Sequence, residues 1–192
     1  MSHRQGLYDE SFERDACGIG LIANGQRAAD RSIVTGALTT LSRLAHRSAL
    51  GADGKTSDGA GILLQIPDAF FRRKMGLPLP QRGSYAVAQI FVPQAAFDLD
   101  QMRTRFADKA RELGVPVLAW RRVPVLPDCL GLQAKLIEPE THQAFLDTSS
   151  CKQENLYRLR RWAEQTFRRH SGCRDPQTGE TLSQFYICSL ST

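Results

Sequence analysis

The sequence lacks long apolar runs and closely spaced cysteines, and each absence excludes a class of protein. No apolar run approaches the length of a membrane span, and residues 1–16 are polar and acidic where a secretory signal would be apolar. The five cysteines, at positions 17, 129, 151, 173 and 188, form no Cys-x-x-Cys pair, which argues against a zinc or iron–sulfur site. We therefore expect no metal and no cofactor in this chain, no membrane contact, and a cytoplasmic location with reduced thiols.

Nucleic-acid signatures are missing as well. The net charge of +5 in 192 residues is a mild excess, and several arginines fall within residues 155–170. Neither a zinc-finger spacing nor a strand with interleaved aromatic residues accompanies them. We interpret them as a solvated helix face and expect no nucleic-acid partner, since an RNA-binding domain would have to show strong salt-dependent binding.

The apolar periodicity that is present predicts a mixed fold of helices and strands. Spacings of three and four predict helices over residues 31–45, 70–75, 99–113 and 155–170. Short apolar runs predict strands over residues 18–23, 62–66, 85–92, 115–125, 132–137 and 185–190, with a turn-rich break at 172–179. Several strands are apolar on both faces, which is typical of a layered α/β or α+β domain whose sheet is covered by helices.

A glycine-rich loop follows the first predicted helix, and Gly54-Lys55-Thr56 within it suggests a phosphate loop. That motif needs a glycine five positions earlier, where this chain has Ala49, and it follows a strand rather than a helix. Asp53 and Asp58 would also repel a phosphate. We interpret the loop instead as a tight connection lying against an active site, with Asp58 or Arg47 making polar contacts.

Cys17 heads the first apolar run and has two possible roles. A cysteine in such a place is usually a small core residue. However, Gly18 and Gly20 leave room for a substrate to approach the backbone, and Ala16 is a small residue suited to chain cleavage. No Ser-His-Asp or Cys-His pairing is evident elsewhere. Cleavage before Cys17 would give it an α-amino group with a pKa near 8, which can act as the base of its own thiol.

The residues around Cys17 and the glycine-rich loop resemble a known family. Gly6-Leu7-Tyr8-Asp9, residues 12–20, residues 44–67 and Phe185–Ser191 follow, in order, the start of the glutamate synthase large (α) subunits. The similarity runs through essentially the whole chain. It identifies residues 17–192 as the N-terminal part of a class II glutamine amidotransferase domain.

The resemblance implies a fold and a set of site residues. The fold is the α+β N-terminal-nucleophile hydrolase sandwich, with layers αββα. Residues 1–16 are a leader whose removal exposes Cys17, the catalytic nucleophile that attacks L-glutamine. Arg47, Asp58 and Gly18 lie beside it as substrate-binding or supporting residues.

The complete enzyme implied by the resemblance is larger than this chain. Its remaining large-subunit domains use FMN and an iron–sulfur cluster to reduce the product of ammonia and 2-oxoglutarate, with a small NADPH-oxidising subunit as a possible partner. The family's glutamine-gripping His-x-Arg-aromatic-Ser-Thr loop and its His-Asn-Gly-Glu oxyanion loop do not occur here. We expect the first half of the domain, inactive alone. The alternative is a non-catalytic remnant or interaction module of the same fold.

Two serines depart from the family pattern. Ser48 and Ser57 stand where the family usually has glycine. A positive φ at either position would strain the loop by roughly 1–2 kcal/mol.

Overall fold

The computed structural model describes residues 18–25, 29–76, 79–93, 98–151, 153–168, 173–174, 181–183 and 185–192. The chain forms two compact units. Unit 1 holds the described residues up to Ala52 together with Ser57–Leu64, and unit 2 holds Asp53–Thr56 and Gln65–Thr192. Cys17 and the expected leader lie outside the described residues.

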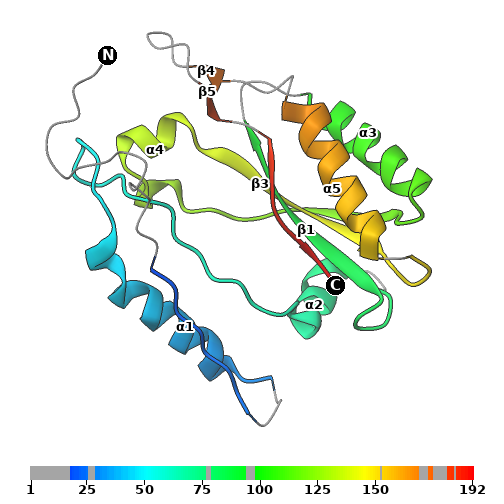
Figure 1. The fold of residues 1–192 in the computed structure, drawn as a ribbon, viewed down its shortest axis with the longest axis horizontal. Helices are drawn as coiled ribbons and strands as arrows, with labels where there is room; N and C mark the ends of the chain where they lie inside the picture. Colours follow the sequence, from blue (N-terminus) through cyan, green and yellow to red (C-terminus); the bar gives the residue numbers. More distant parts are fainter. Residues whose placement is uncertain are drawn as a thin grey trace, which may run out of the picture. The chain divides into compact units, whose positions relative to one another are not determined.

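Helices and strands are mixed along the chain (Figure 1). The helices are α1 (Arg31–Arg43), α2 (Asp68–Met75), α3 (Leu99–Glu112), α4 (Leu132–Leu136) and α5 (Gln153–Arg168), with single turns η2 (Ala45–Arg47) and η3 (Pro127–Cys129). The strands are β1 (Tyr85–Pro93), β2 (Val117–Arg122), β3 (Pro139–Asp147), β4 (Cys173–Arg174), β5 (Thr181–Ser183) and β6 (Tyr186–Ser191). The four predicted helices are confirmed, as are the predicted strands at 85–92 and 185–190. Among the described residues no helix combines the length and the apolar character needed to cross a bilayer.

Unit 2 is built on an antiparallel sheet with strand order β2-β3-β1-β6. The central strands β1 and β3 pair over their whole length, from Tyr85 opposite Asp147 to Pro93 opposite Pro139. Strands β4 and β5 form a separate two-stranded sheet. Helices beside an antiparallel sheet make an α+β arrangement, as predicted.

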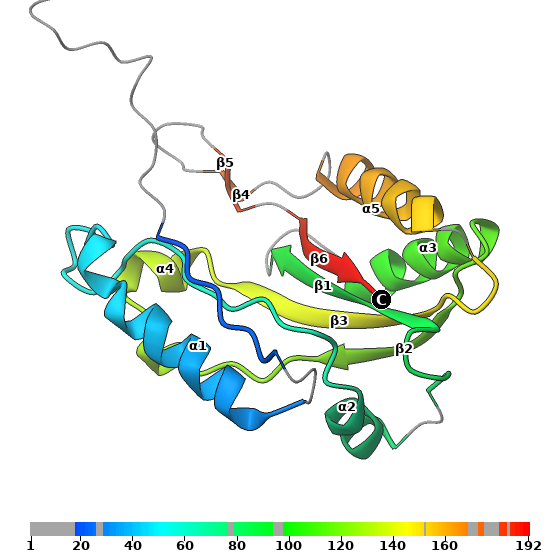
Figure 2. The ribbon, with the colours of Figure 1, turned by 60° about the horizontal axis from the view of Figure 1, so that its bottom comes forward.

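The alternation of side chains along β1 directs residues to two cores. Ala86, Ala88 and Ile90 are fully buried with residues of α3 and α5. Tyr85 and Val87 point to the opposite face and pack with residues of α2 and β3. Figure 2 shows α3 and α5 on one side of the sheet and α2 on the other. Each face of the sheet is therefore covered by its own helices.

Unit 1 is built on α1, which begins at an N-cap where Asp30 Oδ1 accepts from Ser32 N over 2.8 Å. Residues 18–23, predicted as a strand, form no backbone ladder; they run extended along α1. Successive contacts are Gly18 with Leu44, Gly20 with Thr40, and Ile22 with Gly36. Two residues of extended chain cover about 6.6 Å and four residues of helix about 6 Å, so the two segments stay in register.

Three further strand predictions need correction. Residues 62–66 are also extended without a strand partner, because a strand exists only where a second backbone takes up its hydrogen bonds. The predicted strand at 132–137 is instead helix α4, Leu132–Leu136, whose N-terminal contacts are described below. The predicted strand at 115–125 is shorter, spanning only Val117–Arg122, and β3 was not predicted. The turn-rich break at 172–179 lies mostly outside the described residues.

Candidate functional site

The predicted support residues Gly18 and Arg47 lie together in unit 1. A Cβ placed at Gly18 would stand 3.1 Å from Leu44 Cδ2 and 3.4 Å from Arg47 Cδ. Leu44 is the C-cap residue of α1, and Arg47 is the last residue of the following turn η2. The residue directly after Cys17 is therefore fixed against the C-terminal end of α1, with a guanidinium-bearing side chain beside it.

Asp58 closes the base of the glycine-rich loop. Its Oδ2 accepts a hydrogen bond from Ala49 N over 3.0 Å, and Leu50 and Ser57 form an isolated antiparallel bridge. The two arms of the loop are thus held together in unit 1, two residues after Arg47. Ser48 has φ −88°, an extended conformation that any residue adopts, so the strain considered for this departure from the family pattern is absent there.

Gly20, which was expected to give a substrate access to the backbone, packs closely against α1. A Cβ at this position would lie 2.6 Å from Thr40 Cγ2 on α1. The missing side chain allows the segment to approach the helix on this side, whereas the approach of a substrate to the backbone here stays a prediction.

The tip of the loop, Asp53–Thr56, belongs to unit 2 and caps α4. Asp53 Oδ2 accepts from Thr56 Oγ1 over 2.6 Å and from Gln133 N over 3.2 Å, while Oδ1 accepts from Thr56 N over 2.7 Å. The hydrogen bonds from Thr56 hold the pKa of the Asp53 carboxyl well below its usual value. Lys55 Nζ donates to Asp128 O over 2.9 Å. The polar groups that suggested a phosphate loop therefore make hydrogen bonds within the loop, to the start of α4 and to Asp128 instead.

Gly131 lets the loop tip reach α4. It is the N-cap residue of the helix, with φ −71°. A Cβ there would collide with Thr56 N and Oγ1 and would lie 2.6 Å from Asp53 Oδ2. These contacts supply hydrogen bonds to backbone N–H groups at the start of α4, which explains why residues 132–137 are helical despite their strand-like sequence.

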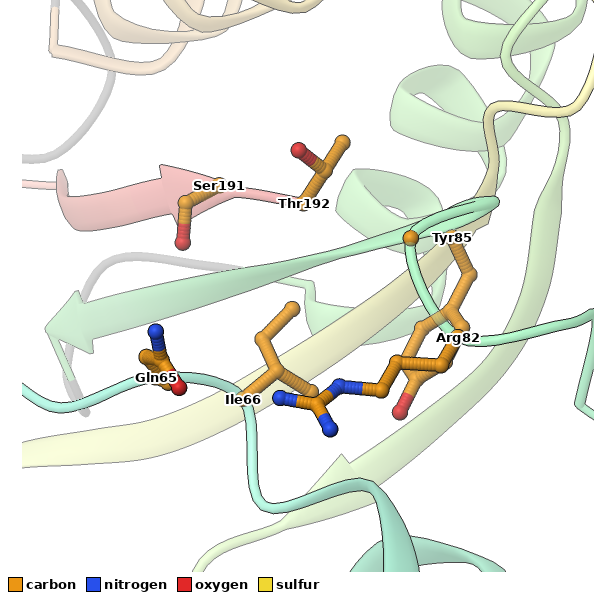
Figure 3. A pocket seen from close by; sticks show the side chains of 7 residues that line it. Gln65, Ile66, Arg82, Tyr85, Ser191 and Thr192 are labelled. Atoms are coloured by element: carbon orange, nitrogen blue, oxygen red, sulfur yellow. The ribbon is translucent and has the colours of Figure 1, made fainter. Parts of the chain in front are cut away.

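A cavity of about 360 Å³ lies in unit 2, and none of the predicted site residues lines it (Figure 3). Its lining is Gln65, Ile66, Arg82, Gly83, Tyr85, Ser191 and Thr192. In Figure 3 the Arg82 and Tyr85 side chains lie next to each other, and Ser191 and Thr192 come from β6 and the residue after it. The Tyr85 hydroxyl does not serve this cavity, because it donates to Asp68 Oδ1 over 2.9 Å.

The structure also contains two partly buried polar clusters, each built around one buried side chain, that the sequence did not indicate. In the first, Asp68 accepts from both Tyr85 and Arg72, the latter over 2.9 Å from Nε to Oδ2. Burial, followed by the hydrogen bond to Asp68, raises the pKa of Tyr85 to about 12. The second joins His142 on β3 to Glu140 and to Arg103 of α3. Neither cluster could be recognised from the sequence, because Tyr85 lies 17 residues from Asp68 and Arg103 lies 39 residues from His142.

The comparisons with known proteins agree on one family. The model of the class-II glutamine amidotransferases matches residues 17–192. The glutamate synthase [NADPH] large chain of Bacillus subtilis is 38% identical over 171 residues, covering 85% of this chain. The corresponding large chain of Azospirillum brasilense is 33% identical over 96% of this chain. The ferredoxin-dependent glutamate synthase of Pyropia yezoensis is 32% identical over 100% of this chain.

The matched region is a small part of each of these relatives. The chain spans 11% of the Bacillus subtilis protein and 12% of each of the other two. The relatives differ in the electron donor that their names give, NADPH or ferredoxin, at similar identity to this chain. What they share over the matched residues is the amidotransferase region. The chain belongs to the class-II glutamine amidotransferase family.

Proposed function

We propose that this chain performs the glutamine-hydrolysing step of a glutamate synthase, with Cys17 as its nucleophile. The observation that supports this most directly is that the family match begins at Cys17 itself. Residues 1–16 then form a leader that is removed, and the cysteine becomes the first residue of the mature chain. Its thiol and its new α-amino group supply both nucleophile and base.

The proposed reaction has two stages. The Cys17 Sγ attacks the side-chain carbonyl carbon of L-glutamine, and the thiol proton passes through the α-amino group to the leaving nitrogen, which departs as ammonia. A γ-glutamyl thioester remains on the sulfur. Water then attacks the thioester carbonyl, glutamate is released, and the thiol regains its proton.

The surroundings of Gly18 support this assignment in unit 1. Arg47 Cδ lies close to Gly18, the residue that follows Cys17. Asp58 accepts a hydrogen bond from Ala49 N and so holds the arm of the loop that follows Arg47. We therefore assign Arg47, Asp58 and Gly18 substrate-binding or supporting roles beside the nucleophile.

The remainder of the synthase reaction belongs to other parts of the enzyme. We propose that ammonia passes to another large-subunit domain, where FMN and an iron–sulfur cluster serve the reaction with 2-oxoglutarate, and that a small NADPH-oxidising subunit is a possible partner. The groups that bind the glutamine carboxylate and the oxyanion lie outside residues 17–192, which form the first half of an N-terminal-nucleophile αββα fold. We expect the cytoplasm as the location.

The test is glutamine hydrolysis by the complete glutamate synthase that contains this chain. We expect Cys17→Ala to lower the release of glutamate and ammonia on the order of a thousandfold or more. The matched control is Cys129→Ala, which changes an exposed cysteine in η3 and leaves the rate unchanged. Full activity of the Cys17→Ala protein would exclude this nucleophile and favour the alternative of a non-catalytic module. Hydrolysis by residues 17–192 alone would contradict the proposed half-domain.

A further inference from the structure

A fully buried histidine lies between two charged side chains in unit 2. His142 is 0% exposed and stands on the face of β3 that packs with α3. Its Nε2 is 2.9 Å from Glu140 Oε2, and its Nδ1 is 3.3 Å from Arg103 Nη2. Its strand partner on β1 is the apolar Ile90. We call Glu140, His142 and Arg103 the β3–α3 latch.

The partners fix which ring nitrogen carries the proton. A guanidinium nitrogen can only donate, so the Nδ1 facing Arg103 must present its lone pair. The ring proton is then on Nε2, where it is donated to the Glu140 carboxylate. His142 is therefore a neutral imidazole whose two nitrogens are both used.

The charged groups around the ring come from three elements. Glu140 lies on β3, Arg103 on α3, and Arg122 on β2, where its Nη2 is 3.3 Å from Glu140 Oε1. Asp100 on α3 is 3.8 Å from Arg103 Nη1. Burial lowers the pKa of His142, while the hydrogen bond to Glu140 opposes that shift. The cations on both sides add to the preference for the neutral ring.

Arg103 has few other restraints. Its Nε is buried and has no hydrogen-bond partner in the described part of the chain. The guanidinium carbon lies 5.6 Å from the centre of the Trp120 ring on β2. The hydrogen bond to His142 is thus a polar contact that joins α3 directly to β3. A proton on Nδ1 would set two donors and two like charges against each other.

We propose that the β3–α3 latch is an acid-sensitive device: protonation of His142 breaks its bond to Arg103 and loosens the contact of α3 with the sheet. The helix stays packed through its buried apolar residues. Its local opening becomes more frequent when the ring is charged, because only the Glu140 side of the ring can still be satisfied.

The experiment is hydrogen exchange of the α3 amides in the full-length protein, corrected for the intrinsic effect of pH. Between about pH 7 and about pH 5.5, we expect the protection factors to fall by at most roughly eightfold. This is the fall expected if His142 binds one proton only in the open form, with the ordinary histidine pKa of about 6.5. His142→Gln keeps a neutral donor toward Glu140 and should abolish that fall. His46→Gln, at an exposed histidine of η2, is the matched control and should retain it. An unchanged fall in His142→Gln overturns the proposal.

A second measurement does not depend on the variant folding. The imidazole nitrogen spectrum of the unmodified protein should show His142 as a neutral ring protonated on Nε2 at neutral pH. A charged ring, or a proton on Nδ1, contradicts the latch.

Discussion

At the scale of single residues, Gly20 offers a direct test of the packing in unit 1. Gly20→Ala would bring a methyl group to 2.6 Å from Thr40 Cγ2. Because threonine is stiff at χ1, we expect the free energy of unfolding to fall by roughly 1–3 kcal/mol. Adding Thr40→Ser removes the opposing methyl and should restore part of that loss. Chemical denaturation of the single and double variants measures both effects.

The control for this prediction is Gly25→Ala, where an added Cβ meets nothing within 4 Å. It should leave stability within a few tenths of a kcal/mol of the parent. Equal losses in Gly20→Ala and Gly25→Ala would show that the contact with Thr40 does not matter.

The raised pKa of Tyr85 predicts that the free energy of unfolding falls in alkali. Its folded-state pKa of about 12 exceeds the ordinary value of about 10, so only the unfolded chain ionises between these values. The contribution is complete below about pH 10 and is lost as pH rises toward 12, amounting to roughly 2–3 kcal/mol. We expect Tyr85→Phe to be less stable than the parent at neutral pH, through the lost bond to Asp68, but to decline less steeply in alkali. Denaturant titrations across this range give the slopes.

Tyr157→Phe serves as the comparison, because Tyr157 is an exposed residue of α5. Its alkaline slope should match that of the parent. The account of Tyr85 fails if the Tyr85→Phe protein declines as steeply as the Tyr157→Phe protein.

The residues of the candidate site divide between those that sequence could identify and those that it could not. Arg47 and Asp58 could be proposed because the motif in which they stand is continuous in the sequence. The structure shows Arg47 Cδ near Gly18 and Asp58 accepting from Ala49 N, and their roles toward glutamine stay a prediction. The clusters around Asp68 and His142 join residues from different elements. Only the folded chain brings such residues together, so no local spacing could predict them.

At the scale of elements, α4 depends on its contact with the loop tip. Gly131→Ala forces a methyl group against Thr56 and Asp53, and because φ at Gly131 is −71° the cost is steric alone. We expect a loss of roughly 1–3 kcal/mol in the free energy of unfolding, measured by thermal or chemical denaturation. Gly59→Ala, with open space around its Cβ, is the control. No difference between the two would contradict the capping contact.

The elements that sequence predicted wrongly show where periodicity fails. Helix α4 has five residues, and its N-terminal N–H groups donate hydrogen bonds to Asp53 and Thr56, which lie 80 and 78 positions before their donors. Strand β3 is central in its sheet yet carries His142 and Gln143, which are hydrogen-bonded to Arg103 of α3 and Arg121 of β2 respectively. A buried polar residue that is satisfied by tertiary contacts reads as a surface residue in the sequence alone. Long helices with a clear apolar stripe, such as α3 and α5, were predicted well.

At the scale of the whole molecule, the α+β class was predictable and the pairing of the N-terminal segments was not. Ile19 and Leu21 are 90% and 92% exposed, on the side of the extended segment that faces away from α1, and Leu63 is 88% exposed. Their alternation is that of a strand, but no backbone in the described residues pairs with them. The predicted strands at 18–23 and 62–66 are therefore wrong, because no second backbone takes up their hydrogen bonds in the described residues.

The central claim, that Cys17 is an N-terminal nucleophile for glutamine, is tested most directly by labelling. The protein from its native cell is treated with a glutamine analogue that carries a diazoketone in place of the side-chain amide, and its peptides are mapped by mass spectrometry. We expect the adduct on a peptide that begins at Cys17, and competition by L-glutamine. A chain that retains Met1, or an adduct on another residue, would contradict the account.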